Sequence, residues 1–307
     1  MKKIFFLLLF IITIPIFALD FSFSVEPNFS FNNDSLTYKI YDGTRVNSQL
    51  DWNASYLFKA GIGLNFEIEN LIVSNANLFS LPLKCGIMYD SDWYTEGIKT
   101  NLSVHDLQTD FCYDFSLDLK YRFSVPQNFY FYQVLSLKNF YSQFRAKEGT
   151  GWCGDMAHTG LDEDHPWNSE FNVCVEKNGI NLDNTISAFF LGLEIQKDFD
   201  RFFFDVAFLT APFVYISSLD HHLNAEGGRY YLLIQNAFFS CYEVDIKSGI
   251  HLNKKNVLKF STDLSFSPEL KGVLYFGKKR SNEELADETA SFSLKKSSVS
   301  VIWNIIF

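Results

Sequence analysis

Two short acidic motifs, far apart in the chain, contain the residue types best suited to chemistry. The first is Asp90-Ser91-Asp92 and the second is Asp220-His221-His222. In an extended strand, side chains two positions apart point to the same face, so Asp90 is aligned with Asp92, and Asp220 with His222. Two carboxylates that face a carboxylate–histidine pair can hold and deprotonate a water molecule for hydrolysis. The candidate catalytic residues are therefore Asp90, Asp92, Asp220 and His222.

These residues have distinct expected roles, and two simpler alternatives stay open. Asp220 would orient the imidazole of His222 and stabilise the imidazolium, while the Asp90/Asp92 pair would bind the water and share a proton. The first alternative is a metal site that uses His221 and His222, although adjacent strand residues point to opposite faces. The second is that all of these side chains are simply solvated.

The start of the chain and its charge limit the location and the partners. Lys2 and Lys3 precede an apolar run that ends at Phe17 and Ala18, which is typical of a secretory signal peptide. We expect residues 1–18 to be this peptide and residues 19–307 to form one domain. The net charge of −10 argues against nucleic acid as a partner.

Five cysteines in an exported chain leave at least one unpaired. Cys153 and Cys174 fall in the same polar stretch and could bridge a loop. The simplest interpretation of Cys85, Cys112 and Cys241 is that they are small apolar residues on strands.

Hydrophobic alternation with period two dominates the sequence and predicts strands. Phe111, Tyr113, Phe115, Leu117 and Leu119 alternate with Cys112, Asp114, Ser116, Asp118 and Lys120. A soluble sandwich could show the same pattern. Strands of about ten residues or more, which match a bilayer crossing, and a terminal Phe307 favour an outer-membrane barrel instead.

The lengths of the connections predict the number of strands. Short turns are expected at residues 69–70, 124–128, 198–200 and 253–256, and long loops at 41–47, 93–102, 147–181, 218–230 and 277–289. This alternation is typical of outer-membrane barrels. The predicted fold is all-β, a ten-stranded antiparallel transmembrane β-barrel. Asp90 and Asp92 would then end the third strand, and Asp220 and His222 the seventh, facing one another at the extracellular rim.

The motifs resemble those of the omptins, outer-membrane endopeptidases with a ten-stranded barrel. Asp90-Ser91-Asp92-Trp93 resembles the family's Asp-x-Asp-Trp element, and Asp220-His221-His222 its Asp-x-His element. Ser48-Gln49-Leu50-Asp51-Trp52, preceded by Tyr38 and Gly43, is similar to a segment of the second strand. Ser103-x-His105 and Tyr141-Ser142 follow in the family's order. The resemblance covers essentially the whole mature chain.

The resemblance implies that the four candidate residues activate a water molecule that attacks a peptide carbonyl, with no metal or organic cofactor. It places Ser103 and His105 near the active site. Omptins commonly cleave between basic residues by means of acidic pocket residues, and the matching positions here are Ser35, beside Asp34, and Ser218. We therefore expect substrate contact at Ser35 and Ser218 with relaxed specificity, because a basic side chain would lose its ion pair there.

The resemblance also raises the question of a lipid activator and of the binding partners. Omptin activity depends on lipopolysaccharide, and the expected outer-face lipid motif is not reproduced by Ser136, Lys138 and Phe140, although Arg145 or Lys147 could serve another anionic lipid. Activation by outer-membrane lipid thus stays open. The expected partners are extracellular peptides or proteins and these lipids. The rival interpretations are a non-catalytic adhesin or structural barrel and, less favoured because the lumen would be narrow, a porin.

Overall fold

The structure is a computed structural model that describes residues 21–93, 99, 101–125, 128–153, 173–223, 229–277 and 284–307. The expected signal peptide lies outside these residues. Among the residues described, no helix is long and apolar enough to cross a membrane. The side chains of Cys153 and Cys174 also lie outside the described part, so the expected bridge between them stays a prediction.

All elements of the described chain are antiparallel strands. Their bounds are β1 (Phe21–Asp42), β2 (Arg45–Ile68), β3 (Leu71–Ser80), β4 (Leu83–Asp92), β5 (Asn101–Val125), β6 (Phe129–Cys153), β7 (Val173–Phe199), β8 (Phe202–His222), β9 (Arg229–Ala237), β10 (Cys241–Asn253), β11 (Asn256–Gly277) and β12 (Glu284–Ile306). Neighbouring strands of the sheet are antiparallel, and β1 pairs with β12 to close the sheet into a barrel.

The twelve segments form a ring of ten strands, as expected. β3 and β4 both lie between β2 and β5 and follow one line, broken at Leu81 and Pro82, because proline cannot donate to the ladder. In the same way β9 and β10 both lie between β8 and β11. A break at residues 238–240 includes Phe239 at a positive φ of 51°.

The connections at one end agree with the sequence, whereas those at the other end are shorter than expected. Tight turns follow β2, β7 and β10 at residues 69–70, 200–201 and 254–255. At the opposite end, the loop expected at residues 41–47 is a two-residue turn, in which Gly43 supplies a φ of 61°. β6, β7, β8 and β12 likewise extend into segments that we expected to be loops. Their polar composition resembled that of loops because both faces of a strand beyond the bilayer can be polar.

The barrel has two halves that differ in what faces outward. β5, β6 and β7 have 25, 25 and 27 residues, far more than the roughly ten needed to cross a bilayer. In the half nearest the chain termini, large apolar side chains are exposed on the outer face: Phe29, Phe31, Phe204, Phe208, Phe260, Leu264, Val301 and Trp303. We call this half the belt half. It matches the apolar band of a membrane barrel.

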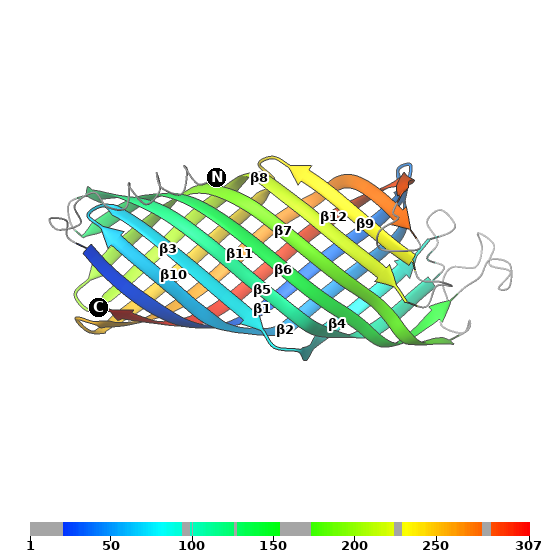
Figure 1. Cartoon of the computed structure of the whole chain (residues 1–307), viewed down its shortest axis with the longest axis horizontal. Coiled ribbons are helices and arrows are strands. Elements are labelled where there is room, and N and C mark those ends of the chain that lie inside the picture. Colours follow the sequence, from blue (N-terminus) through cyan, green and yellow to red (C-terminus); the bar gives the residue numbers. More distant parts are fainter. Residues whose placement is uncertain are drawn as a thin grey trace, which may run out of the picture.

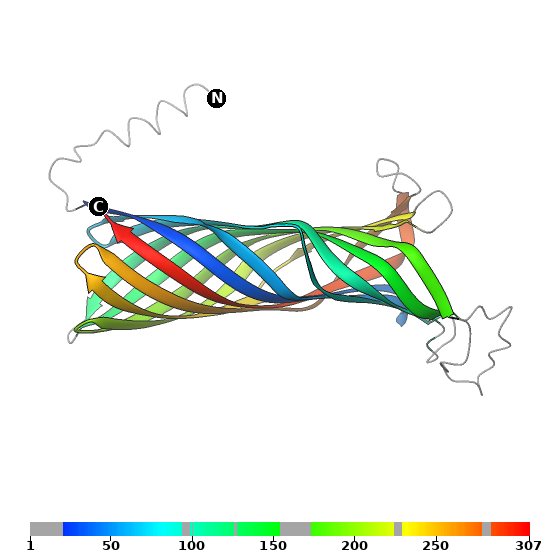
Figure 2. The same ribbon diagram turned by 90° about the horizontal axis from the view of Figure 1, so that it is seen from below.

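The other half, which ends at Asp42, Asp92, Cys153, His222 and Gly277, is called the rim half. Its interior is apolar, with a core that includes Leu36, Tyr38, Leu50, Trp52, Met88, Leu107, Phe144, Leu182, Ile216 and Phe292. Figures 1 and 2 show an elongated barrel with steeply tilted strands, in which β1 begins and β12 ends at the same end. The rim is the opposite end.

Candidate active site

The Asp90/Asp92 pair lies on the inner face at the end of β4. Its position is fixed by pairing on both sides: Asp90 pairs with Leu50 of β2 and with Ser103 of β5. Asp92 is the last residue of the strand, and the amide of Asn101 lies 3.4 Å from its Oδ2. Both carboxylates share the face of the fully buried Met88, two positions before Asp90, so the strand points them into the barrel.

The Asp220–His222 pair ends β8 on the same inner face as the buried Ile216 and Ser218. The Nε2 atom of His222 lies 2.9 Å from Oδ2 of Asp220. Asp220 is fully buried, whereas 26% of the His222 side chain is exposed. The carboxylate therefore holds the ring from inside while part of the ring stays open to solvent.

Charge links the two motifs. Burial alone would lower the pKa of His222, but Asp220, followed by Asp90 and Asp92, outweighs burial and raises this pKa to about 9. Three carboxylates from two distant strands thus act on one imidazole. The structure brings together all four residues that the sequence nominated as catalytic, because the third and seventh strands of the ring lie across the barrel from one another.

The floor beneath this cluster is mostly apolar, but some of its buried polar atoms make no hydrogen bond. Trp52 is fully buried and stacks on Phe144 with ring centroids 6.4 Å apart. Within the described residues, the Tyr38 hydroxyl, the Ser218 hydroxyl and Oδ1 of Asp220 are buried without a hydrogen-bond partner. Burial, with a contribution from Asp220, raises the pKa of Tyr38 well above its ordinary value. Tyr38 therefore stays a neutral donor beside the candidate cluster.

The Ser103–His105 pair lies beside the cluster, as the sequence motif predicted. The Ser103 Oγ is 2.7 Å from Nε2 of the buried His105. A Cβ at Gly149 of β6 would lie 2.1 Å from the His105 ring, and one at Gly179 of β7 would lie 3.0 Å from its Nδ1. These two glycines therefore form the slot that admits the imidazole. Sequence analysis missed them, although glycines inside strands often mark such close approaches.

The two serines expected to contact substrate are not equivalent. Ser218 is fully buried on the inner face, two residues before Asp220. Ser35 instead belongs to the outward row of β1, and its hydroxyl donates to Asn53 at 2.9 Å. The inward position beside it is Asp34, which lies 3.9 Å from Nζ of the buried Lys59. The structure therefore brings Ser218 to the cluster but does not bring Ser35 there.

His221 does not join His222. Its ring stacks on Tyr230 of β9 at 4.0 Å with an interplanar angle of 10°, on the opposite face of the sheet. In the part of the chain that is described, no group of three or more His, Cys, Asp or Glu side chains is arranged to hold a metal ion. The alternative of a two-histidine metal site thus has no geometric support among these residues.

The expected outer-face lipid position faces the wrong way. Ser136 is buried, and Lys138 forms an ion pair with Glu243 on the opposite side of the barrel interior. The outward row of this part of β6 therefore contains Leu137, Asn139 and Tyr141, which also differ from an aromatic-x-acid-x-arginine motif. The three remaining cysteines agree with their expected role, because Cys85, Cys112 and Cys241 are buried free thiols on strands.

The comparisons with known proteins decide the family. The omptin family model matches residues 29–305. The chain belongs to the omptin family. The crystal structure of the outer membrane protease OmpT from Escherichia coli is similar to it with a TM-score of 0.81 and 16% identity, covering 95% of this chain and 99% of that one. At this identity the likeness establishes the fold, a ten-stranded antiparallel barrel.

Other solved barrels are more distant. The translocator domain of the autotransporter NalP from Neisseria meningitidis covers 92% of this chain and 88% of its own at 10% identity and a TM-score of 0.38. The Neisserial surface protein NspA covers 93% of this chain and 98% of its own at 6% identity and a TM-score of 0.29. No curated protein sequence matches. Omptin membership makes the chain an integral outer-membrane protein and an endopeptidase.

Proposed function

We propose that this omptin cleaves peptide bonds at the extracellular rim with a water molecule activated by Asp90, Asp92, Asp220 and His222. The observation that carries the proposal is the geometry of the dyad, in which Nε2 of the partly exposed His222 lies 2.9 Å from Oδ2 of the buried Asp220. The charges of Asp90 and Asp92 on β4 act on the same imidazole. Short connections at the belt end and longer ones at the rim orient the rim outward, as in other outer-membrane barrels. Substrates would therefore be extracellular peptides or proteins that can enter in extended form.

The proton path follows from the hydrogen bond within the dyad. Asp220 lies against Nε2 of His222, so Nδ1 is the ring nitrogen that would accept the proton of the water. The Asp90/Asp92 pair would hold that water from the other side. Its hydroxide equivalent attacks the peptide carbonyl, and the imidazolium then returns the proton to the leaving amine. Asp220 stabilises the imidazolium between these two transfers.

Specificity would be set by neutral groups. The inner-face position two residues before Asp220 carries the Ser218 hydroxyl, and the Tyr38 hydroxyl also stays neutral. Hydroxyls can hydrogen-bond an uncharged polar side chain but cannot supply the ion pair that a buried basic side chain needs. We therefore expect cleavage sites with neutral residues to be accepted, in contrast to a strict dibasic preference.

The proposed reaction needs no metal or organic cofactor, because His222 and the carboxylates supply both base and acid. Outer-membrane lipid remains a candidate activator. Since the β6 positions discussed above do not form the family's motif, activation would have to use other outward residues such as Arg145 or Lys147, both exposed on β6.

A peptide library tests the proposal. The refolded barrel and its His222→Ala variant are incubated with a diverse quenched-peptide library, with and without outer-membrane lipid. Cleavage by the parent that disappears in the variant supports the dyad mechanism, and the cut sites give the specificity. Absence of cleavage by folded protein under every lipid condition would favour the non-catalytic barrel instead.

A further inference from the structure

The interior of the belt half contains a cavity of about 460 Å³ that the proposed reaction does not use. It lies at the far end of the barrel from the catalytic cluster, and its lining is polar and charged. Residues next to the tight turns, such as Ser22, Asp198 and His251, line it. Because the tight turns mark the periplasmic end, a small molecule would enter from the periplasm.

Most cations of this cavity lie close to a carboxylate partner. Five pairs account for them: Lys120–Glu194 at 2.6 Å, Lys259–Glu26 at 2.6 Å, Arg122–Glu67 at 2.7 Å, Lys296–Asp114 at 2.9 Å, and Lys138–Glu243. Each lysine or arginine is thereby already committed to a near partner. The carboxylates that remain must find compensation elsewhere.

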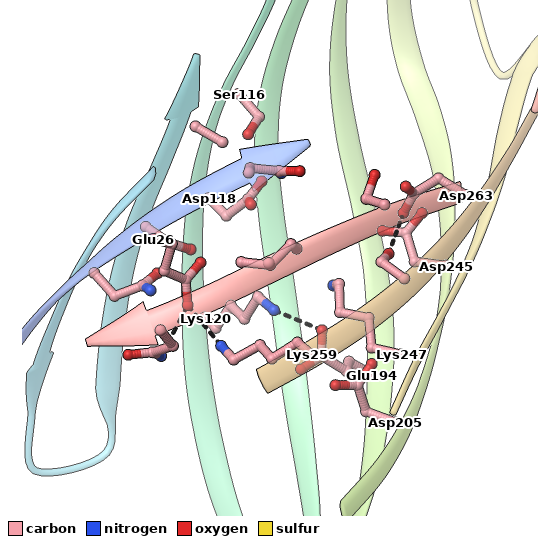
Figure 3. Close-up of a pocket in the computed structure, with 18 of the residues that line it drawn as sticks. Glu26, Ser116, Asp118, Lys120, Glu194, Asp205, Asp245, Lys247, Lys259 and Asp263 are labelled. Atoms are coloured by element: carbon pink, nitrogen blue, oxygen red, sulfur yellow. Dashed lines mark hydrogen bonds and ion pairs between the residues drawn. The ribbon is translucent and has the colours of Figure 1, made fainter. Parts of the chain in front are cut away.

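A group of three aspartates remains around one lysine. Asp245 of β10 lies directly opposite Asp263 of β11, and Lys247 lies opposite Asp205 of β8. Lys247 interacts with all three carboxylates, and Asp263 also accepts from Ser261 at 3.0 Å and Ser298 at 2.8 Å. Figure 3 shows the three aspartates and Lys247 on one side of the cavity, with Lys247 between Asp205 and the Asp245/Asp263 pair. Lys138 also lies 4.0 Å from Asp245, and Asp245 and Asp263 share a side-chain hydrogen bond. Lys138 is already paired with Glu243, however, so the carboxylates still outnumber the lysines and this side has a surplus of negative charge.

Buried oxygen atoms that line the cavity without a hydrogen-bond partner also indicate a site for a cation. Asp205 and Asp245 are 5% and 7% exposed, and each has an Oδ1 atom without a hydrogen-bond partner in the described residues. The other buried, unpartnered side-chain atoms that line the cavity in this part of the chain are Oδ1 of Asn28 and Oδ1 of Asn304. All four atoms are hydrogen-bond acceptors. The cavity therefore calls for a positive charge that brings hydrogen-bond donors.

We propose that this cavity is a binding site for a hydrogen-bond-donating cation, centred on Asp205 and Asp245. No described group of three ligating side chains is arranged to hold a bare metal ion, so the cation keeps its own donors. A hydrated divalent metal ion and an organic polyamine share this chemistry. Bound between β8, β10 and β11, the cation neutralises the surplus charge inside the membrane-spanning half, where unpaired charge is most costly.

Calorimetric titration tests the site and separates the two sources. Parent protein, refolded in a neutral detergent free of lipopolysaccharide, is titrated at low salt with MgCl₂ in one arm and with spermidine in the other. The variants are Asp205→Asn and Asp245→Asn, which keep side-chain shape and remove one charge each. Asp106→Asn is the matched control, because Asp106 carries the same charge on the exposed outer face, paired with Lys84.

We expect saturable binding of at least one cation by the parent, weakened about tenfold or more in each cavity variant and unchanged in Asp106→Asn. Saturation by Mg²⁺ alone would identify a hydrated metal ion, and saturation by spermidine alone a polyamine. The melting temperature of the parent should rise with the bound cation, and that of the cavity variants should not. Absence of saturable binding in both arms, or binding that the two cavity variants leave intact, would overturn the proposal.

Discussion

The rim cluster and the belt-half cavity both gather carboxylates on the inner wall, but they give them different partners. At the rim, Asp90, Asp92 and Asp220 act on His222, whose side chain is partly exposed. In the cavity, the carboxylates face lysines such as Lys120, paired with Glu194 at 2.6 Å. The His222 imidazole can lose and regain a proton as the pH passes its pKa of about 9, whereas a paired lysine keeps its charge. The rim is therefore suited to proton transfer, and the cavity to holding charge.

The rim cluster and the cavity also differ in their surroundings. The rim cluster rests on an apolar floor that includes Trp52 and Phe144 and opens to water above. The cavity is polar inside and is surrounded by the apolar belt, of which Phe204 and Phe260 are part. Under the two proposals, carboxylates of the same type activate water at the rim and hold a cation in the cavity. The partner and the access to water decide which.

The largest expected effect breaks the rim cluster. His222→Ala and Asp92→Asn should each lower kcat at least about 10³-fold, because the base or the water-binding carboxylate is lost. His221→Ala is the matched control: its ring stacks on Tyr230 on the outer face, so activity should stay within a few-fold. Cleavage assays on protein shown to be folded give the comparison. Substantial activity in either rim variant would refute the mechanism.

The pH dependence of peptide cleavage gives a second test of the rim cluster. With a pKa of about 9, His222 is mostly protonated at neutral pH and cannot accept a proton. The fraction in the neutral, basic form grows about tenfold per pH unit below the pKa. The kcat/KM should therefore rise about 50-fold between pH 7 and pH 9 and level off above about pH 10. A profile that is flat over this range would show that His222 is not the base.

A prediction for the cavity concerns stability instead of rate. Lys120→Met leaves the buried Glu194 without its partner and should destabilise the barrel by about 3–5 kcal/mol. Lys84→Met removes the exposed partner of Asp106 and should cost about 0–1 kcal/mol. Urea unfolding of both variants in lipid vesicles measures the difference. Equal losses would mean that water reaches Glu194 and compensates it.

The sequence allowed the ring of ten strands and the four-residue cluster to be predicted for a physical reason. Alternation with period two reports the inner and outer faces, and the number of strands follows from the turns. Asp90 and Asp220 could then be placed across the barrel from one another without any knowledge of distances. The lengths of the loops could not be predicted as well, because polar strands beyond the membrane resemble loops in composition.

The facing of individual residues was predictable only where the environment was constant along a strand. On β1 the inward row changes from Asn32 and Asp34 to Leu36 and Tyr38, and the outward row changes from Phe31 to Ser35. The outside changes from lipid to water at this level, while the inside changes from cavity to core. The apolar row therefore switches faces within one strand, and counting from a motif alone misassigned Ser35.

Ser218→Asp tests which inner-face position sets specificity. The new carboxylate would lie on the inner face beside Asp220, where a basic substrate side chain could neutralise it. Preference for arginine over glutamine at the cleaved bond should rise about tenfold. Ser218→Ala separates the added charge from the loss of the hydroxyl. An unchanged preference in Ser218→Asp would place the specificity pocket elsewhere on the inner wall.

The smallest effect is expected at Ser35, and it separates the two serines most directly. Because the Ser35 hydroxyl bonds Asn53 on the outer face, Ser35→Asp should leave the arginine-to-glutamine preference within about twofold of the parent. The new carboxylate would lie opposite the exposed Lys295 of β12, and a surface pair of this kind adds about 0–1 kcal/mol to stability. Library cleavage and urea unfolding measure the two quantities. A gain of arginine preference in Ser35→Asp would mean that residue 35 of β1 faces the cleft when substrate binds. The assignment of the inward and outward residues of β1 would then be wrong at this position.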